Sequence, residues 1–277
     1  MDHGKDAPEA VVVPARGGPR AVAFAQALNH NLVLVTGALL ILLYLCNALL
    51  VTRFYGTAAA RETETREAAA TLLAEHASRA VSAVEFALES IREKLPPDFA
   101  IQPPSIFTQL MLDERIRGLP QVRAIIILDA AGQVIYDSRH FPSARRDLHD
   151  RTYFTEQKKW RGVGLYIDVS ETARYDHQPF FGISLPLLDS VGGFRGVVTA
   201  LADPRYFART YDGAPGLNSD MVCLLSRTDG AVLASTIAPR SGSPPLQREA
   251  YVLAHRPKSG ISARPVPSFP LRVVLSG

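Results

Sequence analysis

The feature that most constrains this chain is an apolar segment near its N-terminus, Leu32 to Val51, with no charged residue between His30 and Arg53. About 20 residues that each rise about 1.5 Å match the hydrocarbon thickness of a bilayer, about 30 Å. A buried core helix would carry a polar stripe, and here Thr36 and Asn47 are the main interruptions. A cleaved signal peptide has a shorter apolar core of about 7–15 residues. We therefore interpret the segment as an uncleaved membrane anchor.

The flanks of the anchor give the expected topology. Residues 1–30 are rich in Ala, Gly and Pro and predict a short disordered cytoplasmic leader, followed by a transmembrane helix over residues 31–52. Lys and Arg are balanced between the two ends, so the positive-inside rule does not decide the orientation. Because a short leader is easily left in the cytoplasm, we expect a single span of the bacterial inner (cell) membrane. Residues 53–277 would then lie in the periplasm or outside.

Composition indicates a folded domain after the anchor and argues against a nucleic-acid partner, a disulfide framework and a zinc site. The chain is 47% hydrophobic and 21% charged, which is typical of a globular core. A net charge of +3 without a long basic run gives no reason to expect a nucleic-acid partner. The two cysteines, Cys46 and Cys223, form neither a disulfide framework nor a zinc motif. We expect no cofactor and no metal.

A long helix is predicted directly after the anchor, because residues 57–95 contain no Gly or Pro and are rich in Ala, Glu, Arg and Leu. Pro96 and Pro97 stop it, which gives a stalk helix over residues 53–96. Its apolar residues recur at steps of four and three and form one seam: Ala77, Val81, Val84, Leu88, Ile91 and Leu95. Two interpretations of the seam stay open, packing on the chain's own domain and a homodimeric coiled coil.

Beyond the stalk the pattern changes to short strands. Residues 122–128 and 133–137 flank the turn residues Asp129 to Gly132 and predict an antiparallel hairpin. Asp203 and Pro204 predict the start of a helix that runs to Tyr211. The remaining expected elements are a short helix at 153–160, strands at 163–169, 180–188 and 194–202, a second hairpin at 223–234 with Asp229 and Gly230 at its turn, and strands at 261–264 and 271–275. The duplicated hairpin predicts an α+β fold of two stacked modules.

The chain also resembles a known family, the double Cache sensor domains of bacterial transmembrane receptors, of the kind attached to diguanylate cyclases and histidine kinases. The motifs that carry the resemblance are the anchor and long helix, Ile125 to Tyr136, Asp150-Arg151-Thr152-Tyr153-Phe154, Gly164 to Ile167, Gly193 to Val198, Asp203 to Phe207 and Phe269 to Val273. The resemblance implies two PAS-like antiparallel-sheet modules, a membrane-distal one at 97–212 with a small-molecule pocket and a smaller membrane-proximal one at 213–277.

Six residues are the candidates for that implied pocket. Arg151 offers a planar fork of donors suited to a carboxylate or phosphate, and the neighbouring Tyr153 and Phe154 would supply an aromatic wall. Side chains from nearby strands would complete the pocket: Tyr166, Asp168 and Ser184. Asp168 could hold an amine. In the alternative interpretation Asp150 and Arg151 form an ion pair that holds the loop, and the two aromatic residues belong to the core.

The chain departs from the amino-acid-binding members of the family. Where those members resemble an Arg-x-Trp-Tyr pattern, this chain has Arg151-Thr152-Tyr153-Phe154, and the strand around Val197 to Leu201 lacks the acidic ligand partner. These differences disfavour an α-amino acid. A carboxylate or another small metabolite stays open, as does a domain that responds through partners.

Catalytic signatures are missing from the sequence. Gly182 to Pro186 lacks the second glycine of a nucleophile elbow, and no His-Glu-x-x-His motif or phosphate-binding loop occurs. His140, His149 and His177 fall in predicted loops and give no metal-ligand pattern. Because no GGDEF, EAL or histidine-kinase motif occurs, we expect an input region whose output domain is absent from this chain. The alternatives are a stand-alone membrane-anchored binding or scaffold protein and, more weakly, an envelope hydrolase.

Overall fold

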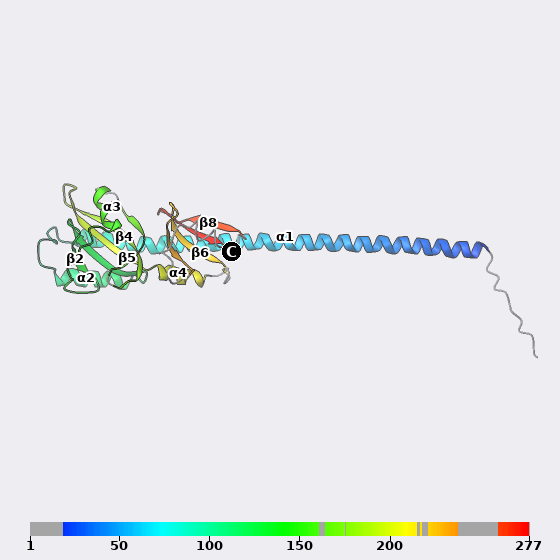
Figure 1. Ribbon diagram of the computed structural model, residues 1–277, viewed down its shortest axis with the longest axis horizontal. Helices are drawn as coiled ribbons and strands as arrows, with labels where there is room; N and C mark the ends of the chain where they lie inside the picture. The colour runs from blue at the N-terminus through cyan, green and yellow to red at the C-terminus, as the bar shows by residue number, and fades with distance from the viewer. Residues whose placement is uncertain are drawn as a thin grey trace, which may run out of the picture. The chain divides into compact units, whose positions relative to one another are not determined.

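The computed structural model describes residues 19–160, 164–174, 176–214, 217, 221–237 and 260–276 (Figure 1). The chain divides into two compact units, Met1–Arg61 and Glu62–Gly277, and helix α1, Pro19–Lys94, contributes to both. The predicted disordered leader is wrong for residues 19–30, which are helical: proline suits the first turn of a helix, and no further Gly or Pro follows until Gly37. Residues 1–18 lie outside the described residues.

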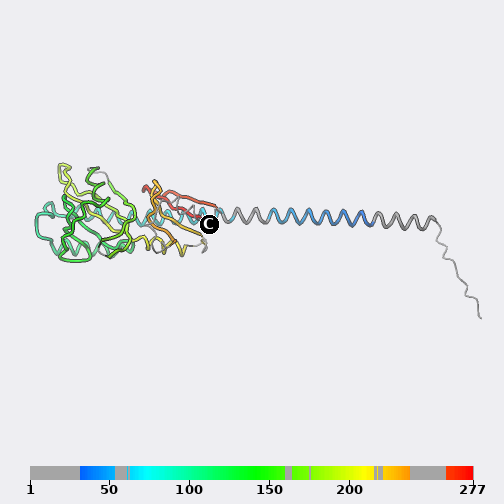
Figure 2. Tube along the Cα trace, viewed as in Figure 1, coloured from blue at the N-terminus to red at the C-terminus, as the bar shows by residue number. Residues whose placement is uncertain are grey.

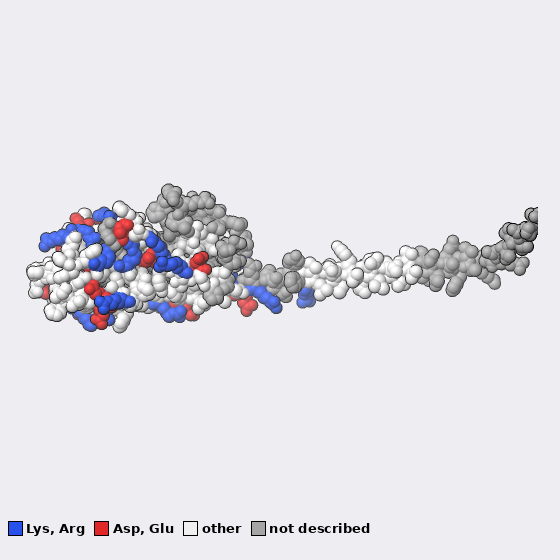
Figure 3. Space-filling view, turned by 90° about the horizontal axis from the view of Figure 1, so that it is seen from below, with Lys and Arg blue, Asp and Glu red and all other residues white. Residues whose placement is uncertain are grey.

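The first unit carries the predicted membrane anchor. Among the described residues, Leu32–Arg53 is the one helical stretch long and apolar enough to cross a membrane, with a mean hydropathy of 2.4 and none of its most apolar window buried. Figure 3 shows a long part of this helix without Lys, Arg, Asp or Glu side chains. The Thr36 hydroxyl donates to the Leu32 carbonyl at 2.7 Å, as a polar group in a hydrocarbon environment must find a partner within the helix.

In the second unit, the remainder of α1 is a core helix. The seam residues Ala77, Val81, Val84, Leu88 and Ile91 are all fully buried, and Leu95 packs beside them. They join the largest hydrophobic cluster, which contains side chains from both sheets. The seam therefore packs on the chain's own domain, one of the two interpretations that the sequence left open. The helix ends at Lys94, before Pro96 and Pro97.

The first sheet has five antiparallel strands in the order β2-β1-β5-β4-β3. Their bounds are β1 Val122–Asp129, β2 Val134–Asp137, β3 Tyr166–Thr172, β4 Pro179–Leu188 and β5 Phe194–Ala202. One face packs against α1 and helix α2, Ile106–Arg117, whereas the other lies under helix α3, Thr152–Trp160, with a second apolar cluster between. Helix α2 is missing from the sequence-based prediction.

The second sheet has four antiparallel strands in the order β7-β6-β9-β8. Their bounds are β6 Val222–Arg227, β7 Val232–Ser235, β8 Ile261–Pro265 and β9 Leu271–Ser276. Figure 2 shows the C-terminal strands in red beside the orange hairpin β6–β7. Helix α4, Pro204–Asp212, connects β5 to this sheet, and the Asp203 carboxylate caps it by accepting the Arg205 backbone N–H at 2.9 Å, as the sequence predicted.

The two hairpins are built alike. Ile127 pairs with Tyr136 in the first and Leu225 pairs with Ala234 in the second, and each has a bulge at the next residue of its first strand. Gly132 and Gly230 occupy the left-handed region at φ values of 86° and 87°, where glycine is favoured. The repeat that the turn residues predicted is therefore a repeat of structure.

Candidate functional site

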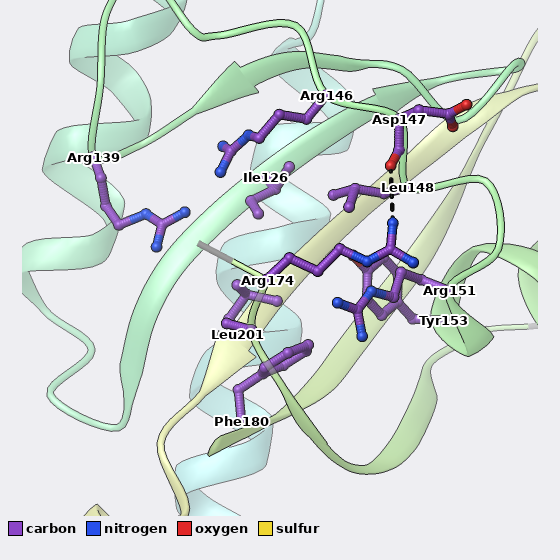
Figure 4. Close-up of a pocket in the computed structure, with 11 residues that line it drawn as sticks. Ile126, Arg139, Arg146, Asp147, Leu148, Arg151, Tyr153, Arg174, Phe180 and Leu201 are labelled. Carbon is purple, nitrogen blue, oxygen red and sulfur yellow. Dashed lines mark hydrogen bonds between the residues drawn. The ribbon is translucent and has the colours of Figure 1, made fainter. Parts of the chain in front are cut away.

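A cavity of about 310 Å³ lies on the α3 face of the first sheet, beneath the segment that joins β2 to α3 (Figure 4). Its lining residues come from three neighbouring strands, from α3, and from the segments before α3 and before β4: Ile126, Arg139, Arg146, Asp147, Leu148, Arg151, Tyr153, Ala173, Arg174, Phe180 and Leu201. Pockets that hold small molecules have volumes of about 300–1,000 Å³, so this one is at the small end of that range.

The floor of the cavity is apolar. Ile126 of β1, Leu201 of β5 and Phe180 of β4 belong to the same buried cluster as Leu148 and Tyr153. These strands are adjacent in the sheet, so period-2 alternation places their side chains on one face. Tyr153 meets Phe180 edge to face with ring centroids 6.4 Å apart, and burial raises the pKa of its hydroxyl well above the usual range. The floor therefore offers contact area for an apolar part of a ligand.

One side of the cavity holds two guanidinium groups that share a carboxylate. Arg139 donates from Nε to Asp137 Oδ1 at 2.9 Å and from Nη2 to Asp137 Oδ2 at 2.7 Å. Arg146 donates to the same Oδ2 atom. Asp137 is 0% exposed. Burial opposes ionisation of this carboxyl, but hydrogen bonds from Arg139 and Arg146 and the Arg139 charge outweigh it and lower its pKa. Asp137 therefore stays charged and fixes both guanidinium groups beside the cavity.

The other side holds two arginines with separate partners. Arg151 Nη1 donates to Glu171 Oε2 at 2.5 Å, and Arg174 pairs with Asp150. Arg174 also donates to the Asp147 carbonyl at 3.3 Å, the bond drawn in Figure 4. The predicted alternative pairing of Asp150 with Arg151 does not form, because each of these two residues has a different partner.

Two of the cavity arginines lie together on the Asp137 side. Arg139 also acts electrostatically on Asp176, which pairs with Arg123. Figure 4 shows Arg139 and Arg146 on the same side of the cavity as Ile126. Because two guanidinium groups line this side, it is suited to an anionic group.

The structure separates the six predicted site residues. Arg151 and Tyr153 line the cavity, whereas Phe154 packs in the core against Phe194, with centroids 5.7 Å apart. The remaining three are not among the lining residues: Tyr166, Asp168 and Ser184. Ser184 is covered by α3, whose Gln157 amide donates to the Ser184 carbonyl at 2.8 Å and lies 3.3 Å from its hydroxyl.

Several lining residues were missing from the sequence-based prediction. Arg139, Arg146 and Arg174 lie in connecting segments that carry no periodic pattern. A run of basic residues, Arg145 and Arg146, followed at once by Asp147 was the available signal, but it does not show which arginine points inward. Within the part of the chain that the structure describes, no group of three or more His, Cys, Asp or Glu side chains is placed to hold a metal ion.

Comparison with known proteins gives a clear result at the level of structure. No protein-family model and no curated protein matches the sequence. The extracellular domain of rpHK1S-Z16, classed as a histidine kinase, superposes with a TM-score of 0.63 at 26% identity and covers 79% of this chain and 94% of its own. The ligand-binding domain of the Pseudomonas aeruginosa PAO1 amino-acid chemoreceptor PctC, bound to GABA, superposes with a TM-score of 0.56 at 15% identity. The match covers 76% of this chain and 95% of the PctC domain. The V. cholerae DctB histidine-kinase sensor domain superposes with a TM-score of 0.55 at 14% identity, and the match covers 79% of this chain and 97% of the DctB domain.

These matches define the class of the protein. The fold, with its long N-terminal helix and two antiparallel sheets, is that of the extracellular sensor domains of histidine kinases and chemoreceptors. The double Cache resemblance and the α+β fold that the sequence predicted are therefore confirmed. Together with the apolar stretch Leu32–Arg53, the match indicates a single-span membrane protein with an extracellular domain.

Proposed function

We propose that this chain is the ligand-sensing input region of a bacterial signal-transduction receptor of the inner membrane, with an output domain of the diguanylate cyclase or histidine kinase type. Residues 97–212 would form the membrane-distal module and residues 213–277 the membrane-proximal one. The chain itself would act by binding and not by catalysis. The cavity under the β2–α3 segment is the observation that carries this proposal, because it provides a defined place for a small molecule.

The expected ligand has one anionic group and a compact apolar body. Arg139 and Arg146 would receive the anion, because both guanidinium groups line one side of the cavity and Asp137 holds them there. The apolar body would lie on Ile126, Phe180 and Leu201. A carboxylate meets both requirements, since a guanidinium group matches its two oxygens.

Ligands of structurally similar domains support the size of this molecule. PctC was solved with GABA, and the *Pseudomonas fluorescens* chemoreceptor CtaA with L-serine. Both ligands carry a carboxylate and an amine. In this chain Asp147 is the acidic residue in the cavity lining, and its half-exposed carboxylate already pairs with His149 at 2.7 Å. A carboxylate without an amine is therefore the first candidate.

Transmission across the membrane would need a second copy of the chain. Helix α1 supports a homodimer through its outer surface, because Leu72 and Phe86 are 47% and 72% exposed on the side away from the buried seam. They lie two heptads apart, so they fall on one stripe of the helix. Ligand binding would change the packing of α1 in both copies, and the helix would carry the change to the anchor.

A thermal-shift screen of the full chain in lipid nanodiscs tests the binding proposal. The library would contain monocarboxylates, dicarboxylates and amino acids. A ligand that binds the native state raises the melting temperature, and a concentration of 100 times Kd adds about 2.7 kcal/mol to the free energy of unfolding. We expect a carboxylate to give the largest shift.

Two matched variants then locate the site. Arg146→Ala removes one guanidinium of the cavity wall and should lower affinity by about 10-fold or more, as expected for a lost charge-assisted hydrogen bond. Arg145→Ala is the control, because Arg145 is the adjacent residue, is exposed and does not line the cavity. Equal loss of affinity in both variants, or in neither, would show that the ligand binds elsewhere.

A further inference from the structure

Asp168 is a buried carboxyl that the ligand cavity does not use. It is 0% exposed on β3, at a β-bulge between Ile167 and Ser170. Its Oδ1 atom accepts the Val169 backbone N–H at 2.7 Å, and its Oδ2 atom has no hydrogen-bond partner among the described residues. Bulges redirect side chains, and a buried oxygen without a partner is costly. This carboxyl therefore does not stabilise the fold in its ionised form.

Four charged or titratable groups surround Asp168. They are Tyr153 of α3, Tyr166 and Glu171 of β3, and Arg227 of β6. Burial and the Glu171 charge raise the pKa of Asp168 to about 7, although the backbone N–H of Val169, the Arg227 charge and the backbone N–H of Tyr153 all act to lower it. Arg227 is already engaged, with Nε 3.3 Å and Nη2 2.5 Å from the Asp229 carboxylate. Arg151, which also acts on Tyr153, is likewise engaged by Glu171.

Asp168 lies beside a hydrogen bond that joins the two sheets. Arg227, at the end of β6 in the second sheet, donates from Nη1 to the Ile167 carbonyl of β3 in the first sheet at 3.2 Å. Ile167 directly precedes Asp168. On its other side Asp168 interacts electrostatically with Tyr153, which lines the ligand cavity. A change of charge at Asp168 would therefore act at once on the junction between the sheets and on the cavity floor.

We propose that Asp168 is a proton-operated latch between the two modules. With the proton in place, the neutral carboxyl stays buried under α3, and Arg227 keeps its bond to the Ile167 carbonyl. When the proton passes to water, the carboxylate leaves its buried position and draws Arg227 from the Ile167 carbonyl, and the junction opens. The receptor then has external pH as a second input, beyond the small-molecule ligand of the proposed function.

Hydrogen exchange of the full chain in nanodiscs, without ligand and across about pH 5 to 9, tests the latch. After correction for the intrinsic exchange rate, amides of β3 and of the β6–β7 hairpin should exchange faster as pH rises, with the change ending near neutrality. The opening equilibrium should change by about tenfold for each pH unit over which Asp168 differs in charge between the closed and open forms. Infrared spectra should show a protonated carboxyl band that disappears over the same range.

Three variants complete the test. Asp168→Asn mimics the neutral acid and should lose both the carboxyl band and the pH dependence of exchange. Asp212→Asn is the control, because Asp212 is an exposed aspartate at the end of α4, and it should behave like the unmodified chain. Arg227→Gln should keep the band but lose the exchange response of the hairpin. A band and an exchange midpoint that survive in Asp168→Asn would overturn the proposal. Because no ligand is added, failure of the ligand screen would leave this result unaffected.

Discussion

The two edges of the first sheet each bury one aspartate, and the two carboxyl groups have opposite properties. Asp137 on edge strand β2 and Asp168 on edge strand β3 are both 0% exposed. Two guanidinium groups lower the pKa of Asp137, whereas burial and a neighbouring glutamate raise the pKa of Asp168 to about 7. Burial is equal in the two cases, so the partners decide which carboxyl stays charged.

This difference separates two tasks within one module. The β2 edge holds charges that persist at neutral pH, because the pKa of Asp137 is lowered and its carboxylate orients Arg139 and Arg146 beside the cavity. The β3 edge holds a charge that changes near neutral pH, next to the contact with the second sheet. A fixed site suits recognition of a ligand, and a titrating site suits regulation.

Removing the carboxylate at the β2 edge should cause the largest loss of stability. Asp137→Asn leaves two guanidinium groups without their shared counterion and should lower the free energy of unfolding by about 3 kcal/mol. Urea unfolding at neutral pH, with Asp212→Asn as the control, measures this loss. The pKa of Asp137 is lowered on folding, so its contribution is present above the unfolded value of 3.8 and is lost as pH falls through the lower folded value. A variant as stable as the unmodified chain would contradict the assigned role.

The β3 edge should respond in the opposite direction. The folded pKa of Asp168 lies above the unfolded value of 3.8, so the native state loses stability as pH rises from about 4 to about 7 and is constant above that range. Asp168→Asn removes this loss and should raise the free energy of unfolding at pH 8 by up to about 4 kcal/mol, with little change at pH 4. Urea unfolding at the two pH values measures the difference. An equal effect of Asp168→Asn at both pH values would mean that Asp168 is already ionised in the native state at pH 4.

The elements around these edges were predictable where local chemistry fixes them. The turn residues Asp129 and Gly132 define the first hairpin, and Asp203 with Pro204 defines the start of α4. Helix α2 was missed because its apolar residues do not all face the core: Phe107 is 79% exposed, whereas Thr108 and Gln109 are buried. The segment has no periodic apolar stripe, and this periodicity is the main signal by which a helix is predicted from sequence.

The candidate site was only partly predictable, because the sequence does not show which part of the strands α3 covers or how the connecting segments run. The strand pattern correctly placed Tyr166 and Asp168 on β3 and Ser184 on β4. That pattern does not tell where along the strands the helix ends and the cavity begins, and here α3 covers Ser184 through Gln157. The arginines that do line the cavity come from connecting segments, whose path depends on tertiary contacts such as the Val134 N–H to Arg146 carbonyl bond at 2.9 Å.

The smallest expected effect concerns the turn that holds the β2 edge against the cavity wall. A Cβ atom at Gly132 would lie 2.6 Å from the His149 Cα and Cβ atoms, in addition to the strain at a φ of 86°. Gly230, the equivalent residue in the second hairpin, has nearly the same φ but no atom within 4 Å of such a Cβ. Gly230→Ala should therefore cost about 1 kcal/mol from backbone strain alone, and Gly132→Ala about 2 kcal/mol.

The more important distinction between these two variants is in ligand affinity. The Gly132 carbonyl accepts the Leu148 N–H at 2.9 Å, so a shift of this turn moves the segment that carries Arg146 and Leu148 of the cavity. Gly132→Ala should weaken binding of the ligand found in the screen, whereas Gly230→Ala should leave it unchanged, because it lies in the other sheet. Isothermal titration of both variants measures this, and equal affinities would show that the cavity wall does not depend on the turn at the β2 edge.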